Sequence, residues 1–271
     1  MNQPTLFTTE EPKSTEVSGR AETVRETIPN TSKIVFFDTE TTGLGPKHRL
    51  CQLAYKTNGR EYESLFKPPL PIDPGASAIT GITNESVASK EPFIGSEMAA
   101  NFQQLANDDT TIFVAHNADF DIEMLQREGI SINKHFDTLR IARVLDDGQA
   151  KNYRQEYLRE YFDLNVDDAR AHDALGDVRV LEALFKRLTE IIIQSDDYSD
   201  DVNTEMTRIM QKPILYKKFT FGKYRGQLIS DVAQKDVRYL KWLQEQKKSA
   251  AANGQKDPDW VHTLNHYLGK K

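Results

Sequence analysis

Two short apolar runs and one long amphipathic stretch limit what this chain can fold into. Lys33–Asp38 (KIVFFD) and Thr110–Ala115 have the length and apolar content of buried β-strands. Asp173–Ile192 carries apolar residues at helical spacing, which predicts a long amphipathic helix. Strands that are followed by strand–helix alternation predict an α/β fold with a mixed sheet.

Shorter segments fill in the rest of this expected domain. Arg49–Lys56 and Glu61–Phe66 flank the dipeptide Asn58-Gly59, an arrangement typical of a β-hairpin. We expect further helices over residues 118–128, 137–145 and 153–162, and two more near residues 239–243 and 260–268.

Composition indicates that part of the chain lies outside compact domains. The 271 residues are 38% hydrophobic, which is low for a globular protein. Residues 1–31 are rich in Thr, Glu, Pro and Ser, and residues 194–201 are acidic and polar. We therefore divide the chain into a disordered tail (1–31), a first domain (32–193), a linker (194–212) and a C-terminal module (213–271).

The single cysteine and the apolar runs exclude several classes of protein. Cys51 cannot form an internal disulfide, and we interpret it as a small core residue. No apolar run approaches the roughly 18 residues of a membrane span, and no signal peptide is apparent. These features predict a cytoplasmic protein without a membrane partner.

Charge is divided unevenly along the chain. Residues 1–211 carry 22 Lys and Arg against 36 Asp and Glu, whereas residues 212–271 carry 13 against 5. An acidic first part with a basic C-terminal module favours two units with different partners. Basic segments are often only solvated surface, so the charge alone does not establish nucleic-acid binding.

Four carboxylates stand at the ends of the predicted elements. Asp38 and Glu40 are two residues apart at the end of the first strand, so both side chains share one face of the sheet. Asp121 opens a helix after the second apolar strand, and Asp177 lies in the first turns of the long helix. Together they would carry four negative charges, which two Mg²⁺ or Mn²⁺ ions would balance.

Two such ions are suited to phosphodiester cleavage, which also needs a proton acceptor. His172 lies five residues before Asp177, and an imidazole can accept a proton from water near neutral pH. Each residue taken alone has a simpler explanation, because Asp121 or Asp119 can cap a helix and His172 can be half-buried. Their joint occurrence in matching strand and helix contexts favours the catalytic interpretation.

Three segments carry a resemblance to a known family. Asp38-Thr-Glu-Thr-Thr-Gly43, His116-Asn-Ala-Asp-Phe-Asp121 and His172-Asp-Ala-Leu-Gly-Asp177 closely resemble the motifs of DEDDh, or DnaQ-like, 3′–5′ exonucleases. The resemblance covers about residues 33–190 and implies a ribonuclease-H-like fold with a mixed five-stranded sheet and flanking helices. It also implies that Asp38, Glu40, Asp121 and Asp177 bind two metal ions and that His172 is the general base.

The resemblance extends to residues that would contact the substrate. Thr41, Thr42 and Leu44 form the turn that would pack against the terminal nucleotide, with Leu44 under the base. Ala78-Ile-Thr-Gly-Ile82 matches a family segment that usually has His where this chain has Thr80, so sugar or base contacts there are in doubt. Asp137-Thr138 is assigned to helix capping. The full set of expected substrate contacts is Thr41, Thr42, Leu44, Ile79, His116, Asn117, Lys223 and Arg225.

The C-terminal module resembles the C-terminal domain of bacterial exodeoxyribonuclease X enzymes. The matching segments are Phe219–Gly226, Ser230–Asp236, Tyr239–Leu243 and His266–Leu268. Basic residues at 217, 218, 223 and 225 alternate with aromatic ones, a pattern that can contact phosphates and unpaired bases. For the aromatic residues a small packed core is the favoured interpretation.

The resemblance implies a 3′–5′ exodeoxyribonuclease that acts in DNA repair or recombination. The alternatives are an RNA 3′-end trimming exonuclease, a catalytically silent nucleic-acid-binding protein and a polymerase proofreading subunit. Gln3, Leu6 and Phe7 form a Q-x-x-L-F peptide similar to those that bind the bacterial sliding clamp. Family members are often homodimers, so a homodimer is a further expectation.

Overall fold

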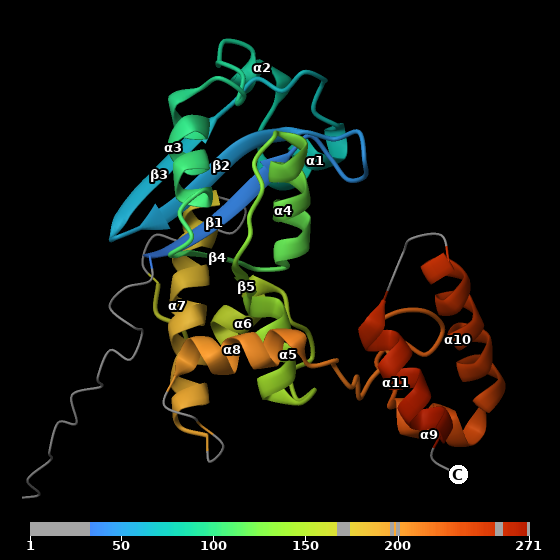
Figure 1. Ribbon diagram of the computed structural model, residues 1–271. Coiled ribbons are helices and arrows are strands. Elements are labelled where there is room, and N and C mark those ends of the chain that lie inside the picture. Colours follow the sequence, from blue (N-terminus) through green and yellow to red (C-terminus); the bar gives the residue numbers. More distant parts are fainter. Residues whose placement is uncertain (1–32, 167–173, 196–197, 199–200, 253–256, 270–271) are drawn as a thin grey trace, which may run out of the picture.

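A mixed five-stranded sheet forms the centre of the larger part of the molecule (Figure 1). The computed structural model describes residues 33–166, 174–195, 198, 201–252 and 257–269. The strand order is β3-β2-β1-β4-β5. Strand β2 pairs antiparallel with both β1 and β3, whereas β4 runs parallel to β1 and β5 runs parallel to β4. The expected α/β fold with a mixed five-stranded sheet is therefore confirmed. The strands are β1 (Lys33–Thr41), β2 (Leu50–Thr57), β3 (Arg60–Leu65), β4 (Thr111–Ala115) and β5 (His135–Asp137).

The hairpin between β2 and β3 follows from its turn residues. Asn58 and Gly59 both have positive φ angles, 49° and 72°, which suit a two-residue hairpin turn. The two strands pair from Thr57–Arg60 at the turn to Gln52–Leu65 at the far end. The hairpin expected from the Asn-Gly dipeptide is present.

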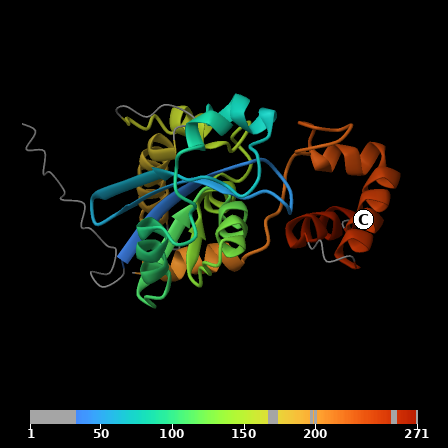
Figure 2. The same cartoon turned by 90° about the horizontal axis from the view of Figure 1, so that it is seen from above.

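Helices cover both faces of the sheet (Figure 2). On one face, α3 and α4 pack against the phenylalanines of β1 and β4. On the other face, α7 packs against the sheet and is itself flanked by α5, α6 and α8. The helices of this part are α1 (Pro74–Thr80), α2 (Asn84–Val87), α3 (Glu97–Ala106), α4 (Ala118–Arg127), α5 (Thr138–Asp146), α6 (Gln155–Tyr161), α7 (Ala174–Ile193) and α8 (Val202–Gln211).

Alternation along β1 decides which residues meet each layer. Val35 and Phe37 belong to the core under α3 and α4, whereas Phe36 belongs to the core under α7. Asp38 and Glu40 continue the Phe36 series, so they point to the face that α7 covers. This places them on the same side of the sheet as the first turn of α7.

The segment expected to be a linker contains a packed helix. Val202, Met206 and Ile209 of α8 are buried in the same core as α7, with exposed fractions from 0% to 7%. Asp201 caps this helix by accepting hydrogen bonds from the backbone amides of Asn203 and Thr204. Residues 194–212 were expected to form a linker, but α8 within this range is packed onto the larger part of the molecule. Three apolar residues at helical spacing suffice to hold α8 against the core.

A separate helical module follows Pro213. Its helices are α9 (Ile229–Lys235), α10 (Val237–Ala252) and α11 (Pro258–Gly269). They enclose a small core of their own in which Phe219 stacks on Trp260 at 5.6 Å between ring centroids. The aromatic residues of this module therefore pack mainly with each other, as expected. Among the described helices, none combines the length and apolar character needed to cross a bilayer.

Candidate active site

Three carboxylates converge where β1 meets the start of α7. One carboxylate oxygen from each of Asp38, Glu40 and Asp177 lies within 4.8 Å of the other two. The first two come from adjacent same-face positions of β1, and the third comes from the first turn of α7. Gln155 at the start of α6 donates a hydrogen bond of 2.7 Å to the backbone carbonyl of Asp177. The turn that carries Asp177 is thereby tied to a second helix.

Asp121 approaches the same cluster from α4. Its Oδ1 atom accepts hydrogen bonds from the backbone amide of Thr39 at 3.1 Å and from the Thr39 hydroxyl at 2.6 Å. The Asp121 side chain is buried, whereas that of Asp119, two residues earlier, is exposed. Asp121 thus lies near enough to Asp38 and Glu40 for its charge to raise their pKa values, and its role as a metal ligand stays a prediction.

The pKa shifts of these carboxyl groups follow from burial and mutual repulsion. Burial raises the pKa of Asp38 well above its usual value, and the charge of Asp121 adds to the effect. Burial and the charges of Asp177 and Asp121 raise the pKa of Glu40 to about 7. Burial also raises the pKa of Asp121 to about 7, although its hydrogen bonds from Thr39 oppose that shift. Carboxylates grouped in this way favour a bound cation, which would relieve both effects.

The donor set also indicates which cations would fit. All four candidate ligands are carboxylates, and hard oxygen ligands suit Mg²⁺ or Mn²⁺ better than softer metals. The single cysteine, Cys51, is buried, and its pKa is raised to about 12, mainly by burial. It is the small core residue expected from the sequence. His172, the expected base, lies outside the described residues, so its placement remains an expectation.

Thr39 is a residue of this site that the sequence interpretation missed. It lies between the two acidic residues of β1, and its side chain points to the opposite face, where α4 runs. The signal was available, because the alternation that puts Asp38 and Glu40 on one face must put Thr39 on the other. Thr39 is a positioning residue that fixes one oxygen of Asp121.

The turn after β1 uses its two threonines internally. The Thr41 hydroxyl donates to the backbone carbonyl of Gly43 at 2.9 Å, and the buried Thr42 hydroxyl lies 3.1 Å from Nδ1 of His48. Gly43 has a φ of 147°, and a Cβ atom there would come within 2.6 Å of the His48 ring. The two threonines thus shape the turn, which differs from the direct substrate contacts expected of their side chains.

Two exposed apolar side chains flank this turn. Leu44 is 80% exposed at its tip, and Ile79 is 61% exposed on α1. Large apolar groups left in water are available to a ligand. In contrast, the Thr80 hydroxyl donates to the carbonyl of Ala76 and accepts from the amide of Ile82, so it closes the end of α1. Leu44 and Ile79 remain the two expected substrate contacts that the structure leaves accessible here.

His116 differs from its expected role as a substrate contact. Both of its ring nitrogens have partners inside the protein: Nδ1 lies 2.9 Å from the Thr138 hydroxyl, and Nε2 lies 2.8 Å from the carbonyl oxygen of Tyr153. Burial lowers the pKa of His116, so the neutral ring is favoured. Asp137 caps α5 by accepting from the Leu139 amide, as expected. We conclude that His116 anchors the loop around Tyr153 rather than offering a nitrogen to substrate.

Asn117 stands at the N-terminus of α4 in a left-handed conformation, with φ 67° and ψ 48°. Its backbone amide donates to Asp137 at 2.9 Å, and its side chain is exposed. Asn is one of the few residues that adopt this conformation readily. Its side chain stays free for the predicted contact.

The two expected contacts in the C-terminal module separate in the structure. Lys223 Nζ lies 3.0 Å from an Asp236 carboxylate oxygen and above the rings of Tyr224 and Tyr239. Arg225 has no carboxylate partner among the described residues and lines a cleft between the module and the larger part of the molecule. Lys223 is therefore occupied within the module, which differs from the prediction, whereas Arg225 is available.

Comparisons with known proteins bear on both parts of the chain. A family described as Exonuclease matches residues 35–185, and one described as Exodeoxyribonuclease X-like C-terminal matches residues 219–248. Exodeoxyribonuclease 10 of Escherichia coli (strain K12) is 33% identical over 207 residues, which cover 75% of this chain and 83% of that protein. A DNA polymerase III subunit epsilon-like protein of Rhodobacter capsulatus is also 33% identical, over 63% of this chain and 25% of its own length.

A solved structure shares the fold of the larger part. An E. coli exonuclease I–single-stranded DNA complex matches with a TM-score of 0.51 and 24% identity. The match covers 60% of this chain and 43% of that chain.

Proposed function

Because this chain belongs to the Exonuclease family and is therefore an exonuclease, we propose that it hydrolyses DNA stepwise from the 3′ end and releases nucleoside 5′-monophosphates. The observation that carries the proposal is the carboxylate cluster, in which oxygens of Asp38, Glu40 and Asp177 lie within 4.8 Å of one another. Such a dense group of partly buried acids is costly to fold unless it binds cations, because like charges repel at short range. A cluster of this kind is the usual device for binding the metal ions of a nuclease.

Four residues of this chain would hold two divalent cations. Asp38 and Glu40 present oxygens from β1, Asp177 from α7 and Asp121 from α4. Bound there, a pair of divalent cations supplies Lewis-acid polarisation of the phosphate and a more acidic water. The fit rests on the oxygen-only donor set and on the raised pKa values of the carboxyl groups, since both favour a hard divalent ion.

The remaining steps would fall to residues around the cluster. His172 would accept the proton of the attacking water, because an imidazole titrates near neutral pH. Thr39 would keep Asp121 oriented through its two hydrogen bonds. Leu44 and Ile79 would pack against the terminal nucleotide, because they are large apolar groups exposed beside the turn that follows β1.

DNA is favoured over RNA by the named relatives. The E. coli relative, 83% of whose length is matched, is called an exodeoxyribonuclease, and the family that matches the C-terminal module carries the same word. Removal of 3′ nucleotides from DNA is an activity used in repair and recombination, which is the process we propose. RNA trimming on the same fold is the alternative, because the acidic cluster itself does not distinguish the two sugars.

The test uses 5′-labelled DNA and RNA strands with Mn²⁺, Mg²⁺ or EDTA. We expect a ladder of products shortened one nucleotide at a time on DNA, and a slower ladder on RNA. The ladder should vanish in EDTA and in Asp38→Ala. Release of a labelled 5′ nucleotide in the first turnover would overturn the 3′–5′ direction, and activity in Asp38→Ala would overturn the role of the cluster.

The tail peptide that contains Gln3, Leu6 and Phe7 lies outside the described residues. We propose that it binds a bacterial sliding clamp, because Leu6 and Phe7 are adjacent large apolar residues in a polar tail. A titration of clamp with wild type and with Leu6→Ala/Phe7→Ala tests this. Equal affinity of the two proteins would discard the idea.

A further inference from the structure

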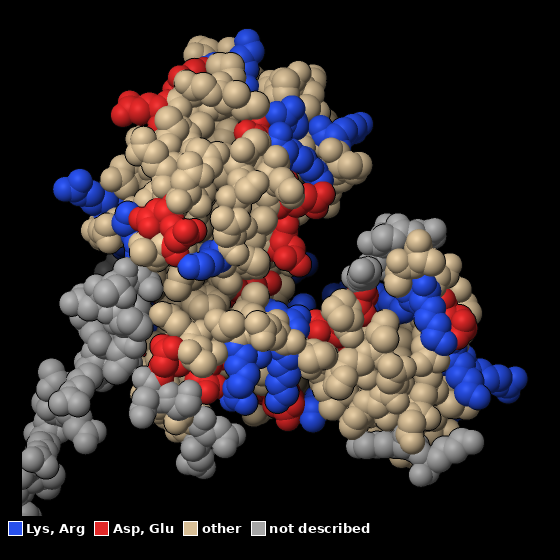
Figure 3. Space-filling view, in the orientation of Figure 1, with Lys and Arg blue, Asp and Glu red and all other residues tan. Residues whose placement is uncertain are grey.

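A cleft separates the C-terminal module from the larger part of the molecule, which we call the body (Figure 3). It encloses about 490 Å³, within the range of ligand-binding pockets. The body contributes the segment after α5 and the start of α6, and the module contributes residues 214–220 with Arg225 and Gly226. The cleft is distinct from the acidic cluster, and none of its described lining residues is a candidate metal ligand.

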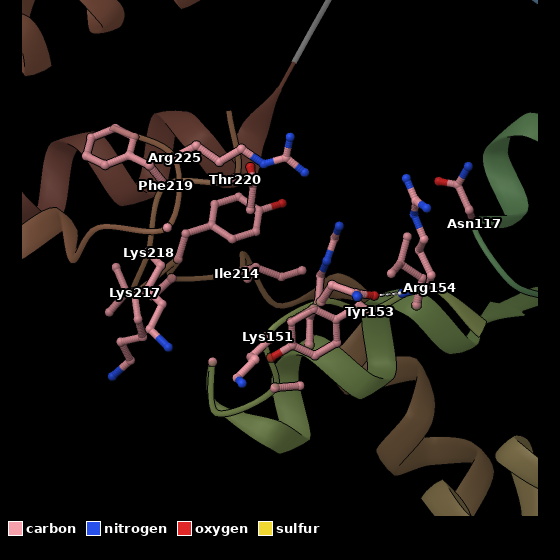
Figure 4. Close-up of a pocket in the computed structure, with 18 of the residues that line it drawn as sticks. Asn117, Lys151, Tyr153, Arg154, Ile214, Lys217, Lys218, Phe219, Thr220 and Arg225 are labelled. Carbon is pink, nitrogen blue, oxygen red and sulfur yellow. Dashed lines mark hydrogen bonds between the residues drawn. The ribbon is translucent and has the colours of Figure 1, made fainter. Parts of the chain in front are cut away.

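The lining of this cleft is basic on both walls. Arg143, Lys151 and Arg154 come from the body, and Lys217, Lys218 and Arg225 come from the module. No Asp or Glu is among the described lining residues. Figure 4 shows Arg225 reaching across the space from the module, with Arg154 and Asn117 on the opposite side. Six cations gathered in a hollow of a protein with a net charge of −6 indicate an anionic ligand.

Most of these cations are not used to stabilise the fold. Lys217 pairs with Asp147 at 3.3 Å, and Arg143 lies above the rings of Tyr153 and Tyr216 at 5.8 and 5.9 Å. Lys151, Arg154, Lys218 and Arg225 are exposed and have no ion pair among the described residues. Unpaired cations on facing walls are free to contact successive phosphates.

Two helices, α4 and α6, begin at the cleft and lead to the acidic cluster. Asn117 lines the cleft at the N-terminus of α4, and Asp121 follows about one helical turn later on the same helix. Arg154 lines the cleft at the N-terminus of α6, and the next residue, Gln155, bonds to the backbone of Asp177. The same helix starts that border the cleft therefore orient two of the four carboxylates.

A partly buried contact fixes the two walls relative to each other. Arg140 on α5 makes two hydrogen bonds to Asp259 on α11, at 2.7 and 3.2 Å, and also donates to the carbonyls of Met210 and Lys212. Asp259 in turn accepts from the amide of Ile214, which lines the cleft. The module is thus fixed against the body at the base of the cleft, as a preformed groove requires.

We propose that this cleft binds the sugar–phosphate backbone of the unpaired strand upstream of the nucleotide that the acidic cluster removes. The inference rests on the proposed exonuclease function, and it assigns the C-terminal module a role in holding the substrate. An unpaired strand is favoured because the half-buried rings of Tyr153 and Tyr216 line the cleft between the cations. Aromatic rings bind exposed bases, which a duplex keeps stacked inside.

The test measures binding without catalysis. Affinity for a fluorescein-labelled single-stranded thymidylate 12-mer is measured in EDTA by anisotropy, over a range of salt concentrations. The module-wall variant is Lys218→Gln/Arg225→Gln, and the body-wall variant is Lys151→Gln/Arg154→Gln. The matched control is Arg238→Gln/Lys241→Gln, which removes the same two residue types from exposed positions of the module outside the cleft.

We expect each wall variant to bind about tenfold more weakly and to lower the slope of log K against log salt by about 1.4, the value for two lost phosphate contacts on a single strand. The control should match wild type, and a duplex 12-mer should lose less affinity than the single strand. Wall variants that bind like the control would overturn the proposal, and so would an equal loss on duplex and single strand.

The binding assay contains EDTA, so it is independent of the cleavage ladder. If wild type binds the 12-mer through the cleft but yields no ladder with Mn²⁺, the proposed exonuclease function fails. If the ladder appears but the wall variants bind normally, only the cleft inference fails.

Discussion

The acidic cluster and the basic cleft differ in how their charged side chains are held, although helices α4 and α6 connect the two regions. In the cluster, carboxylates are crowded onto regular elements, and their pKa values rise mainly through burial and further through mutual repulsion. In the cleft, cations are spread over loops and helix starts, and most are exposed to solvent.

The difference reflects what each region would bind. A compact divalent ion needs ligands that are fixed to within a fraction of an ångström, so strands and helix turns supply them. A strand of repeating phosphates can be held by flexible cations whose contributions add along its length. The properties to test are therefore the exact positions of the ligands in the cluster and the additive contributions of the cations in the cleft.

The largest effect is expected in the cluster itself. Asp121→Asn should reduce the rate of cleavage by about 1,000-fold, because loss of a charged ligand removes several kcal/mol of metal-assisted stabilisation. Asp119→Asn is the matched control on the same helix, and its exposed side chain lies outside the cluster. Single-turnover cleavage of labelled DNA measures both. Equal losses in the two variants would remove the distinction between them.

The contact that fixes the cleft comes next. Arg140→Gln should destabilise docking of the module by about 3 kcal/mol, because it leaves the buried Asp259 carboxylate without its cation. Arg187→Gln breaks an exposed ion pair and should cost less than about 0.5 kcal/mol. Urea unfolding followed by the fluorescence of Trp242 and Trp260, together with affinity for the 12-mer, provides the measurements. A normal midpoint and normal affinity for Arg140→Gln would contradict a fixed cleft.

Thr39 offers a smaller and more specific change. Thr39→Val keeps the strand but removes the 2.6 Å hydroxyl bond to Asp121, so metal affinity should fall by about 10–100-fold. Thr39→Ser restores the hydroxyl and should restore most of that affinity. The dependence of the cleavage rate on Mn²⁺ concentration reports the change. A Val variant with an unchanged metal dependence would show that Thr39 only packs.

The smallest effect is expected on the pH dependence of the free energy of unfolding of the metal-free protein. Because the pKa values of Glu40 and Asp121 are raised to about 7, the folded state binds more protons than the unfolded chain between about pH 4.5 and 7. Stability from these groups is present at low pH and is lost as pH rises through about 7, by roughly 2 kcal/mol in EDTA.

Urea midpoints at pH 6 and pH 8 measure this loss. Glu40→Gln should flatten the difference, and a divalent cation should reduce it in wild type. A wild-type protein that is equally stable at both pH values in EDTA would contradict the raised pKa values of Glu40 and Asp121.

Much of the fold was accessible from the sequence because local patterns and tertiary structure agree. The apolar runs that became β1 and β4, the Asn58-Gly59 turn and the long helix α7 were all predicted. The short strand β5 was missed because three residues carry no detectable alternation. The helix α8 was taken for linker because the acidic segment before it masked Val202, Met206 and Ile209.

The candidate site was predictable where it depends on alternation and motif, and less so where it depends on partners distant in sequence. Asp38, Glu40 and Asp177 come together as the sequence indicated. The pairing of Lys223 with Asp236, 13 residues away, could not be deduced from a list of basic residues. The cleft could not be anticipated either, because its two walls come from segments about 60 to 110 residues apart that only the folded chain brings together.

On the proposed function, the carboxylate cluster binds the divalent cations that assist cleavage of the strand. Titration of Mn²⁺ into the metal-free protein with a thymidine 5′-monophosphate ligand, followed by calorimetry, tests it most directly. We expect two Mn²⁺ ions per chain in wild type and in Asp119→Asn, and loss of at least one ion in Asp121→Asn. Two ions bound in Asp121→Asn with wild-type affinity, or none bound in wild type, would contradict it.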